Sequence, residues 1–238
     1  MKIIFLISFV TTGLFAQSQP IESGKADSDN YLSELKTELQ MEWPENRTIN
    51  IIFHGHSVPS GYFKTPLVNT FSAYPNQFLK KLKSKYPYAV VNVIITSIGG
   101  ENSIEGAKRF KKDVLIHKPD VIFIDYALND RGVGLEKSYV AWNKMVKLAK
   151  KKGIKVILLT PSPDQRINYD SPDNELKKHT KQIISIADES HLGLVDSYEA
   201  FEFLYTDKEE LSKYMSQVNH PNQMGHELIA DKIIKWFE

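Results

Sequence analysis

Five short apolar runs, alternating with stretches of helical spacing, constrain the fold of this 238-residue chain most strongly. They lie at residues 48–53, 90–96, 121–126, 156–160 and 192–195 and are rich in valine, isoleucine and leucine. Such runs are typical of parallel strands that are covered on both faces. Because strand and helix alternate, we expect right-handed crossovers and an α/β fold, a three-layer α/β/α sandwich.

Apolar residues at helical spacing predict four helices between and around these runs. One precedes the first run, one follows it, one precedes the fourth run and one ends the chain. Their apolar positions are Leu32, Leu35 and Leu39; Phe78, Leu79 and Leu82; Ala141, Met145, Leu148 and Ala149; and Leu228, Ile229, Ile233 and Trp236. No internal repeat or domain boundary interrupts the chain after residue 30, so we expect one domain over residues 30–238.

The first 29 residues differ in character from the rest. Lys2 precedes an apolar run at residues 3–10, and a stretch with small residues ends at Ala16. This is the layout of a secretory signal peptide, and the run is too short to span a bilayer, which takes about 20 apolar residues. We therefore expect a signal peptide at residues 1–16, a polar linker at 17–29, and a secreted or periplasmic protein without stable membrane insertion after cleavage. A buried N-terminal strand is the weaker alternative.

Composition excludes several classes of function. The 30 lysines and arginines nearly balance the 29 acidic residues. The chain therefore has no global electrostatic case for binding nucleic acid or an anionic membrane. Because the sequence has no cysteine, disulfides, thiolate metal sites and cysteine nucleophiles are excluded as well.

Four polar or flexible positions follow the predicted strands or precede the last helix. Active sites of open parallel sheets lie beyond the carboxyl ends of the strands. Ser57 offers a nucleophilic hydroxyl there, and Gly99-Gly100 can present backbone N–H groups to an anion. Asn129 can donate its amide to an oxyanion, and His220 can act as a general base. Each alone would be an ordinary turn or capping residue, but their joint placement favours one site.

These blocks resemble those of the SGNH, or GDSL-type, hydrolase family over about residues 48–238. The matching segments are Gly55-His56-Ser57, Gly100, Leu128-Asn129-Asp130 and His220-Pro221-Asn222. The resemblance implies a flavodoxin-like five-stranded parallel sheet and hydrolysis of esters of lipids or acylated carbohydrates, without a metal or another cofactor. It implies Ser57 as nucleophile, His220 as base, and an oxyanion hole formed by the Ser57 and Gly100 N–H groups and the Asn129 side chain.

Three positions depart from the family pattern. His56 stands where the family has the aspartate of Gly-Asp-Ser, and Ala127 stands where it has the glycine of Gly-x-Asn-Asp. Gln217 occupies the position of the triad acid, three residues before the histidine. Loss of the acid in a comparable triad costs about 10⁴ in turnover, or roughly 5.4 kcal/mol.

Another group must therefore orient His220. We expect Gln217 to do so through its side-chain carbonyl, and a backbone carbonyl would serve similarly in a Ser-His dyad. A carboxylate from elsewhere, such as Glu101 or Asp130, is a further alternative. If only the acid is missing, restoring aspartate at position 217 should raise activity.

Substrate contacts are expected from His56, Asp130 and Tyr62. Residues 161–173 form a predicted loop that can border the site, with side chains suited to hydroxyl or carboxylate groups at Asp164, Gln165 and Arg166. An apolar entrance, as a lipid would need, is not evident in that loop. We therefore favour a small-molecule or glycan ester as substrate, and a carbohydrate O-acetylesterase as function. A lipase or lysophospholipase-type esterase and a catalytically impaired SGNH-like binding module are the alternatives.

Histidines offer one competing interpretation. His54 and His56, together with His220 and His226, could bind a metal, since histidine is a good zinc ligand. Spacing fixes no clear third ligand, so we expect no metal. We expect His226 to be a packing or capping residue in the last helix.

Overall fold

A computed structural model describes residues 24–238. The predicted signal peptide and residues 17–23 of the predicted linker lie outside the described residues. Residues 24–29, the rest of that linker, pack against the domain: Ala26 is buried, and its N–H donates to the Leu192 carbonyl at 2.9 Å. Among the residues described, no helix is long and apolar enough to cross a membrane.

The five predicted strands form one all-parallel sheet in the order β2-β1-β3-β4-β5. Their bounds differ from the prediction by at most two residues: β1 (Thr48–Gly55), β2 (Val90–Ile95), β3 (Val121–Asp125), β4 (Lys155–Leu159) and β5 (Gly193–Val195). This order is the flavodoxin-like one, so the predicted fold is confirmed. A short antiparallel pair that was not predicted, β6 (Met215–Gln217) and β7 (His220–Pro221), lies outside the sheet.

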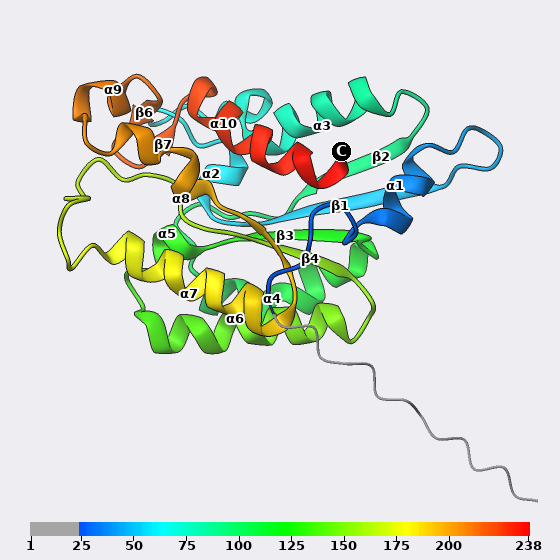
Figure 1. Cartoon of the computed structure of the whole chain (residues 1–238), viewed down its shortest axis with the longest axis horizontal. Coiled ribbons are helices and arrows are strands. Elements are labelled where there is room, and N and C mark those ends of the chain that lie inside the picture. Colours follow the sequence, from blue (N-terminus) through cyan, green and yellow to red (C-terminus); the bar gives the residue numbers. More distant parts are fainter. Residues whose placement is uncertain (1–23) are drawn as a thin grey trace, which may run out of the picture.

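Helices cover both faces of the sheet (Figure 1). They are α1 (Ser33–Leu39), α2 (Ser57–Ser60), α3 (Tyr74–Lys85), α4 (Ser103–Asp113), α5 (Ala127–Asp130), α6 (Leu135–Lys150), α7 (Glu175–Ser190), α8 (Ser197–Ala200), α9 (Lys208–Ser212) and α10 (Gln223–Ile234). The four predicted helices correspond to α1, α3, α6 and α10. The long helices α4 and α7 were missed, because polar residues occupy their inner faces: Ser103 in α4, and His179 and Thr180 in α7, are buried.

Alternation along the strands divides the core into two layers. Phe53 and Phe123 stack with ring centroids 4.7 Å apart on the face covered by α1, α3 and α10. Their neighbours Ile52 and Ile122 point to the opposite face, where α4, α6 and α7 pack. This period of two is the geometry of a strand that is buried on both sides.

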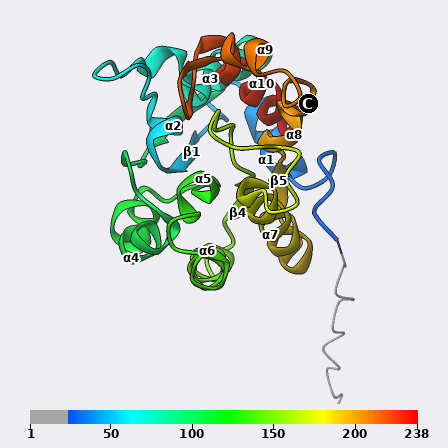
Figure 2. The ribbon, with the colours of Figure 1, turned by 90° about the vertical axis from the view of Figure 1, so that its left-hand side faces the viewer.

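The carboxyl ends of the strands all lie at one edge, which faces the viewer in Figure 2. There β1 leads into α2 and β3 leads into α5, on either side of the point where the strand order reverses. Gly55 makes this approach feasible, because a Cβ at that position would lie 2.4 Å from the Asp125 carbonyl oxygen. The fold therefore brings the first turns of α2 and α5 together.

Candidate active site

Ser57 and His220 form a hydrogen-bonded pair at this edge. Ser57 is the first residue of α2, and His220 lies in β7. The Ser57 Oγ is 2.9 Å from the His220 Nε2, and the two residues are only 6% and 9% exposed. Residues 163 positions apart in the chain thus meet as a hydroxyl and an imidazole suited to proton transfer.

The other ring nitrogen of His220 has two neighbours. The Gln217 side-chain nitrogen lies 2.6 Å from Nδ1, and the Phe63 carbonyl oxygen lies 3.2 Å from it. The Gln217 oxygen accepts hydrogen bonds from the Thr65 backbone N–H and hydroxyl at 3.1 and 3.2 Å. A backbone N–H can only donate, so it holds the oxygen towards Thr65 and the amide nitrogen towards the ring. The expected contact through the Gln217 carbonyl is therefore wrong.

These two neighbours favour opposite tautomers of the ring. When Nδ1 carries the proton it donates to the Phe63 carbonyl, and Nε2 is free to accept the Ser57 proton. When Nε2 carries the proton, Nδ1 accepts from the Gln217 amide, and the ring cannot act as a base. Which nitrogen is protonated depends on the partner of the other nitrogen. The Phe63 carbonyl therefore favours the tautomer that a general base needs, whereas the Gln217 amide favours the other one.

The sequence allowed a backbone carbonyl in this role but could not identify Phe63 as its source, because any residue type carries such a carbonyl. It belongs to the segment from Tyr62 to Val68, whose ends pair in an antiparallel bridge. This segment, called the Tyr62–Val68 hairpin below, contacts His220 through Phe63. Burial lowers the pKa of His220 from its ordinary 6.5, and the Phe63 carbonyl partly opposes that shift. The ring is therefore neutral, as a base must be, at neutral pH.

The two carboxylates considered as substitutes for the triad acid have other partners. Glu101 forms an ion pair with Arg109. Asp130 is fully buried and accepts hydrogen bonds from the Ser103 N–H at 2.8 Å and the Trp142 indole at 2.6 Å. Neither orients the imidazole.

The three groups expected to form the oxyanion hole differ in how far their N–H groups are already engaged. The N–H groups of Ser57 and Gly100 have no acceptor within residues 24–238. The Asn129 side chain uses one N–H to bond the Glu101 carbonyl at 2.9 Å, which leaves its second N–H available. Gly100 has a positive φ of 78°, a conformation that other residues rarely adopt.

His56 and Asp130 are not placed to contact a substrate, because both side chains are fully buried. The His56 Nδ1 accepts from the Val58 N–H at 3.2 Å, and its Nε2 lies 3.3 Å from Asp125. Asp125 also accepts a hydrogen bond from the Tyr74 hydroxyl at 3.0 Å. His56 therefore caps α2 above a buried carboxylate, and the expectation of substrate binding is corrected for both residues.

Tyr62, in contrast, lies at the rim of the site. It is 40% exposed, and its ring centroid is 6.1 Å from that of His220. The ring rests on the turn before Gly100, where a Cβ at Gly99 would lie 2.6 Å from it. An exposed aromatic face therefore borders the Ser57–His220 pair.

The predicted loop at residues 161–173 does approach the site. The Gln165 N–H donates to the Val218 carbonyl at 2.8 Å, two residues from His220. Asp164 is buried and forms ion pairs with Arg131 and Arg166, so it is not free to recognise a hydroxyl. Of the three polar side chains expected to recognise a substrate in this loop, Asp164 is therefore unavailable.

The histidines do not assemble into a metal site. Among the described residues, no group of three or more histidine, aspartate or glutamate side chains is placed to hold a metal ion. His54 contacts Thr96 and the Gly106 carbonyl, whereas His56 contacts Asp125. His226 is buried and accepts the Tyr74 N–H, which gives it a packing role as expected.

Comparison with known proteins gives a family and several similar folds. A family model described as the GDSL-like lipase/acylhydrolase family matches residues 53–228. Similar solved structures include the acetylxylan esterase Axe2 from Geobacillus stearothermophilus, with 22% identity, a TM-score of 0.65, and coverage of 79% of this chain and 94% of that one. A two-domain esterase, CEX, active on acetylated mannans has 21% identity, a TM-score of 0.69, and coverage of 87% and 52%. A search of curated protein sequences found no match.

Proposed function

This chain belongs to the GDSL-like lipase/acylhydrolase family and is an ester hydrolase, and we propose that Ser57 and His220 hydrolyse short acyl esters, above all acetyl groups on a carbohydrate. The observation that carries this proposal is the 2.9 Å contact between the Ser57 Oγ and the His220 Nε2, beside N–H groups that have no acceptor within residues 24–238. A paired hydroxyl and imidazole and free N–H donors are the groups that a nucleophile, a base and an oxyanion hole require.

The proposed reaction proceeds through an acyl-enzyme. His220 takes the proton from Ser57 as its oxygen attacks the acyl carbon, and Ser57, Gly100 and Asn129 donate to the resulting oxyanion. The collapsing intermediate breaks the bond to the alcohol, which receives the proton from His220. A water molecule, activated by the same ring, then releases the acid and restores Ser57. During both steps the Phe63 carbonyl accepts from the imidazolium Nδ1.

Two observations support a carbohydrate as the carrier of the acyl group. The exposed face of Tyr62 beside His220 offers an amphipathic surface on which a sugar ring can stack. Two similar structures are described as esterases of acetylated xylan and of acetylated mannans. A lipid ester is the second candidate, because the apolar residues Leu67, Val68 and Phe71 are exposed on and just after the Tyr62–Val68 hairpin.

The substrate proposal is tested by acetate release from acetylated xylo-oligosaccharides and acetylated mannan. We expect release from at least one glycan, and p-nitrophenyl acetate to be cleaved at least about tenfold faster than p-nitrophenyl palmitate. A preference for palmitate would favour the lipase-type alternative. A fluorophosphonate probe should label Ser57, since labelling requires an activated hydroxyl; an unlabelled Ser57 with no acetate release would favour the impaired binding module.

We also propose export, supported by the basic start and the short apolar run before Ala16. Expression of the whole chain in a bacterium should yield a protein that begins at Gln17, outside the cytoplasm, as measured by intact mass and cell fractionation. The Leu6→Lys variant interrupts the apolar run and should remain uncleaved inside the cell. A wild-type protein that keeps residues 1–16 in the cytoplasm would contradict the proposal.

A further inference from the structure

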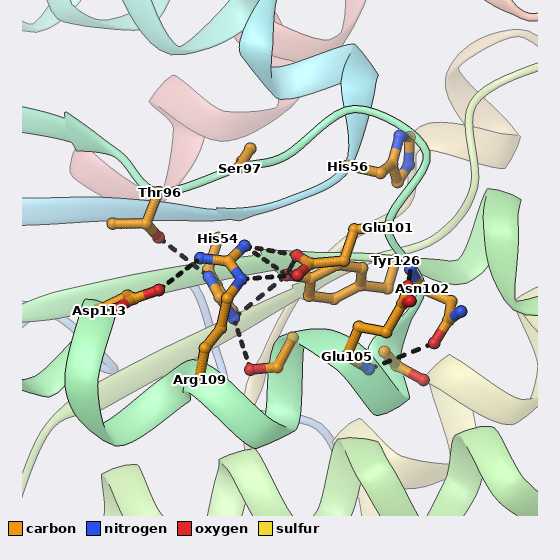
Figure 3. Close-up of polar contacts among 12 residues, drawn as sticks. His54, His56, Thr96, Ser97, Glu101, Asn102, Glu105, Arg109, Asp113 and Tyr126 are labelled. Atoms are coloured by element: carbon orange, nitrogen blue, oxygen red, sulfur yellow. Dashed lines mark hydrogen bonds and ion pairs between the residues drawn. The ribbon is translucent and has the colours of Figure 1, made fainter.

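Glu101, the residue directly after Gly100, places its side chain in a buried polar cluster with Arg109 and Tyr126 (Figure 3). The residue is 8% exposed. Its carboxylate receives two hydrogen bonds from the Arg109 guanidinium, one of them 2.6 Å long from Nε, and a third from the Tyr126 hydroxyl at 2.7 Å. A buried carboxylate is tolerated only with such partners, and the two-point contact with arginine also fixes its orientation.

Two further side chains lie within reach of these partners. The Tyr126 hydroxyl lies 3.2 Å from the His54 Nε2, and Asp113 lies 3.5 Å from Arg109 at the outer end. Burial and the Arg109 charge lower the pKa of His54 to about 3, and burial raises the pKa of Tyr126. Both side chains therefore stay neutral around neutral pH, so the charges around the Glu101–Arg109 pair do not change in that range.

The backbone of Glu101 connects this cluster to two of the three proposed oxyanion donors. Its carbonyl accepts the Asn129 side-chain N–H at 2.9 Å, and its N–H donates to Ile98 at 3.3 Å across the turn that contains Gly100. Directly after it, Asn102 caps α4 and forms a capping box with Glu105. A displacement of Glu101 would therefore move both the Asn129 amide and the Gly100 N–H.

Gly100 has no side chain that could hold its N–H in place. It is exposed, and an added Cβ would meet no atom within 4 Å. Its orientation must therefore come from its neighbours, which are Gly99 beneath the Tyr62 ring and Glu101 in the buried cluster. Of these two neighbours, only Glu101 has a charged side chain held at several points.

We propose that Glu101 is a positioning residue for the oxyanion hole, acting through the Gly100 N–H and the Asn129 amide with Arg109 and Tyr126 as its anchors. The inference rests on the proposed hydrolase function. Removal of one oxyanion donor typically costs about 10²- to 10³-fold in kcat, and a misplacement of about 1 Å can cost about 10²-fold. Because Glu101 acts through donors that remain present, we expect a loss of about 10- to 100-fold in kcat for Glu101→Gln, with KM changed by less than about twofold.

Three variants of the full mature protein test this assignment. Glu101→Gln keeps the shape but weakens the contact with Arg109, and Tyr126→Phe removes a single hydroxyl, so it keeps the test valid if the first variant folds poorly. Asp113→Asn is the matched control, because Asp113 contacts the same arginine away from the turn. Both test variants should lower kcat and weaken inhibition by phenylboronic acid, which forms a tetrahedral adduct with the serine, whereas the control should match the wild type.

A double-mutant cycle separates positioning from general destabilisation. In an Asn129→Ala background, Glu101→Gln should cost much less than in the wild type, because one of the donors it positions is already gone. Full additivity, or a fall in Tm without a fall in kcat for both test variants, would overturn the proposal. Failure of the proposed function is a separate result, in which wild-type protein and Ser57→Ala release acetate at the same rate.

Discussion

Replacing Ser57 by alanine is expected to lower kcat for p-nitrophenyl acetate by at least about 10²-fold and to abolish fluorophosphonate labelling. The hydroxyl that contacts His220 at 2.9 Å is the proposed nucleophile, and without it no acyl-enzyme forms. The oxyanion donors remain in the variant, so a small rate above that of water should persist. The measurement is initial-rate kinetics on purified proteins whose melting temperatures agree within a few degrees.

The size of this loss reports how well the site works without an acid. In serine proteases, removal of the serine costs about 10⁶-fold, and removal of the acid alone costs about 10⁴-fold. If nothing replaces the acid, Ser57→Ala should therefore lower kcat by only about 10²-fold. If the Phe63 carbonyl replaces the acid fully, the same variant should lower kcat by about 10⁶-fold. The Ser84→Ala variant is the control, since Ser84 is an exposed serine of α3. An unchanged rate in Ser57→Ala would exclude this serine as the nucleophile.

Replacing Gln217 by glutamate is expected to raise kcat by at least about tenfold, with about 10⁴-fold as the upper bound set by the acid of a complete triad. Glutamate has the same length, so one oxygen can keep both contacts with Thr65 while the other replaces the nitrogen 2.6 Å from the His220 Nδ1. The exchange turns a donor that favours the wrong tautomer into a charged acceptor that favours the right one. This sharpens the aspartate replacement suggested by the sequence, because the shorter side chain would give up the Thr65 contacts.

The pH profile of the same variant should move in a defined direction. The proposed base must be neutral to accept a proton, so we expect kcat/KM to fall as the pH drops through the pKa of His220. Burial lowers that pKa in the wild type, which places the acid limb below about pH 6.5, the ordinary value for histidine. A carboxylate beside Nδ1 favours the imidazolium and raises the pKa, so the limb should move to higher pH.

Gln217→Leu separates the two contributions of the glutamate variant. Leucine removes the amide donor but adds no charge, so it should not raise the pKa of His220 as glutamate does. If neither variant exceeded the wild-type rate, the Phe63 carbonyl would already hold the productive tautomer by itself, and the interpretation of Gln217 as an opposing contact would be wrong.

The sheet was predictable because its strands carry their own signal. Residues 51–53 of β1 send side chains alternately to two cores, so every position is apolar and the run stands out. The inner faces of α4 and α7 carry Ser103, His179 and Thr180, and the apolar pattern that would identify them is broken. Polar groups can be buried there because the tertiary structure surrounds them, which local sequence does not record.

Within the site, too, some residues could be located from the sequence and others could not. Ser57, Asn129 and His220 could be located because they follow strands or precede the last helix of an open parallel sheet, where such sites form. The buried partners of His56 and Asp130 could not, because they come from distant elements. Glu101 is an example. Its carboxylate suggested a substitute for the triad acid, but in the folded chain it contacts Arg109 and Tyr126 instead of His220.

The sequence by itself determined the layered α/β fold, the family and the identity of the proposed nucleophile and base. Strand periodicity is local, and each catalytic block occupies a few consecutive residues. Only the tertiary structure decided what orients His220. That depends on a backbone carbonyl from the Tyr62–Val68 hairpin and on the Thr65 N–H. The Thr65 N–H binds the Gln217 side-chain oxygen, so the Gln217 nitrogen faces His220. The carbonyl and this N–H are both backbone groups common to nearly every residue, so their effect exists only where the folded chain brings them against a particular side chain.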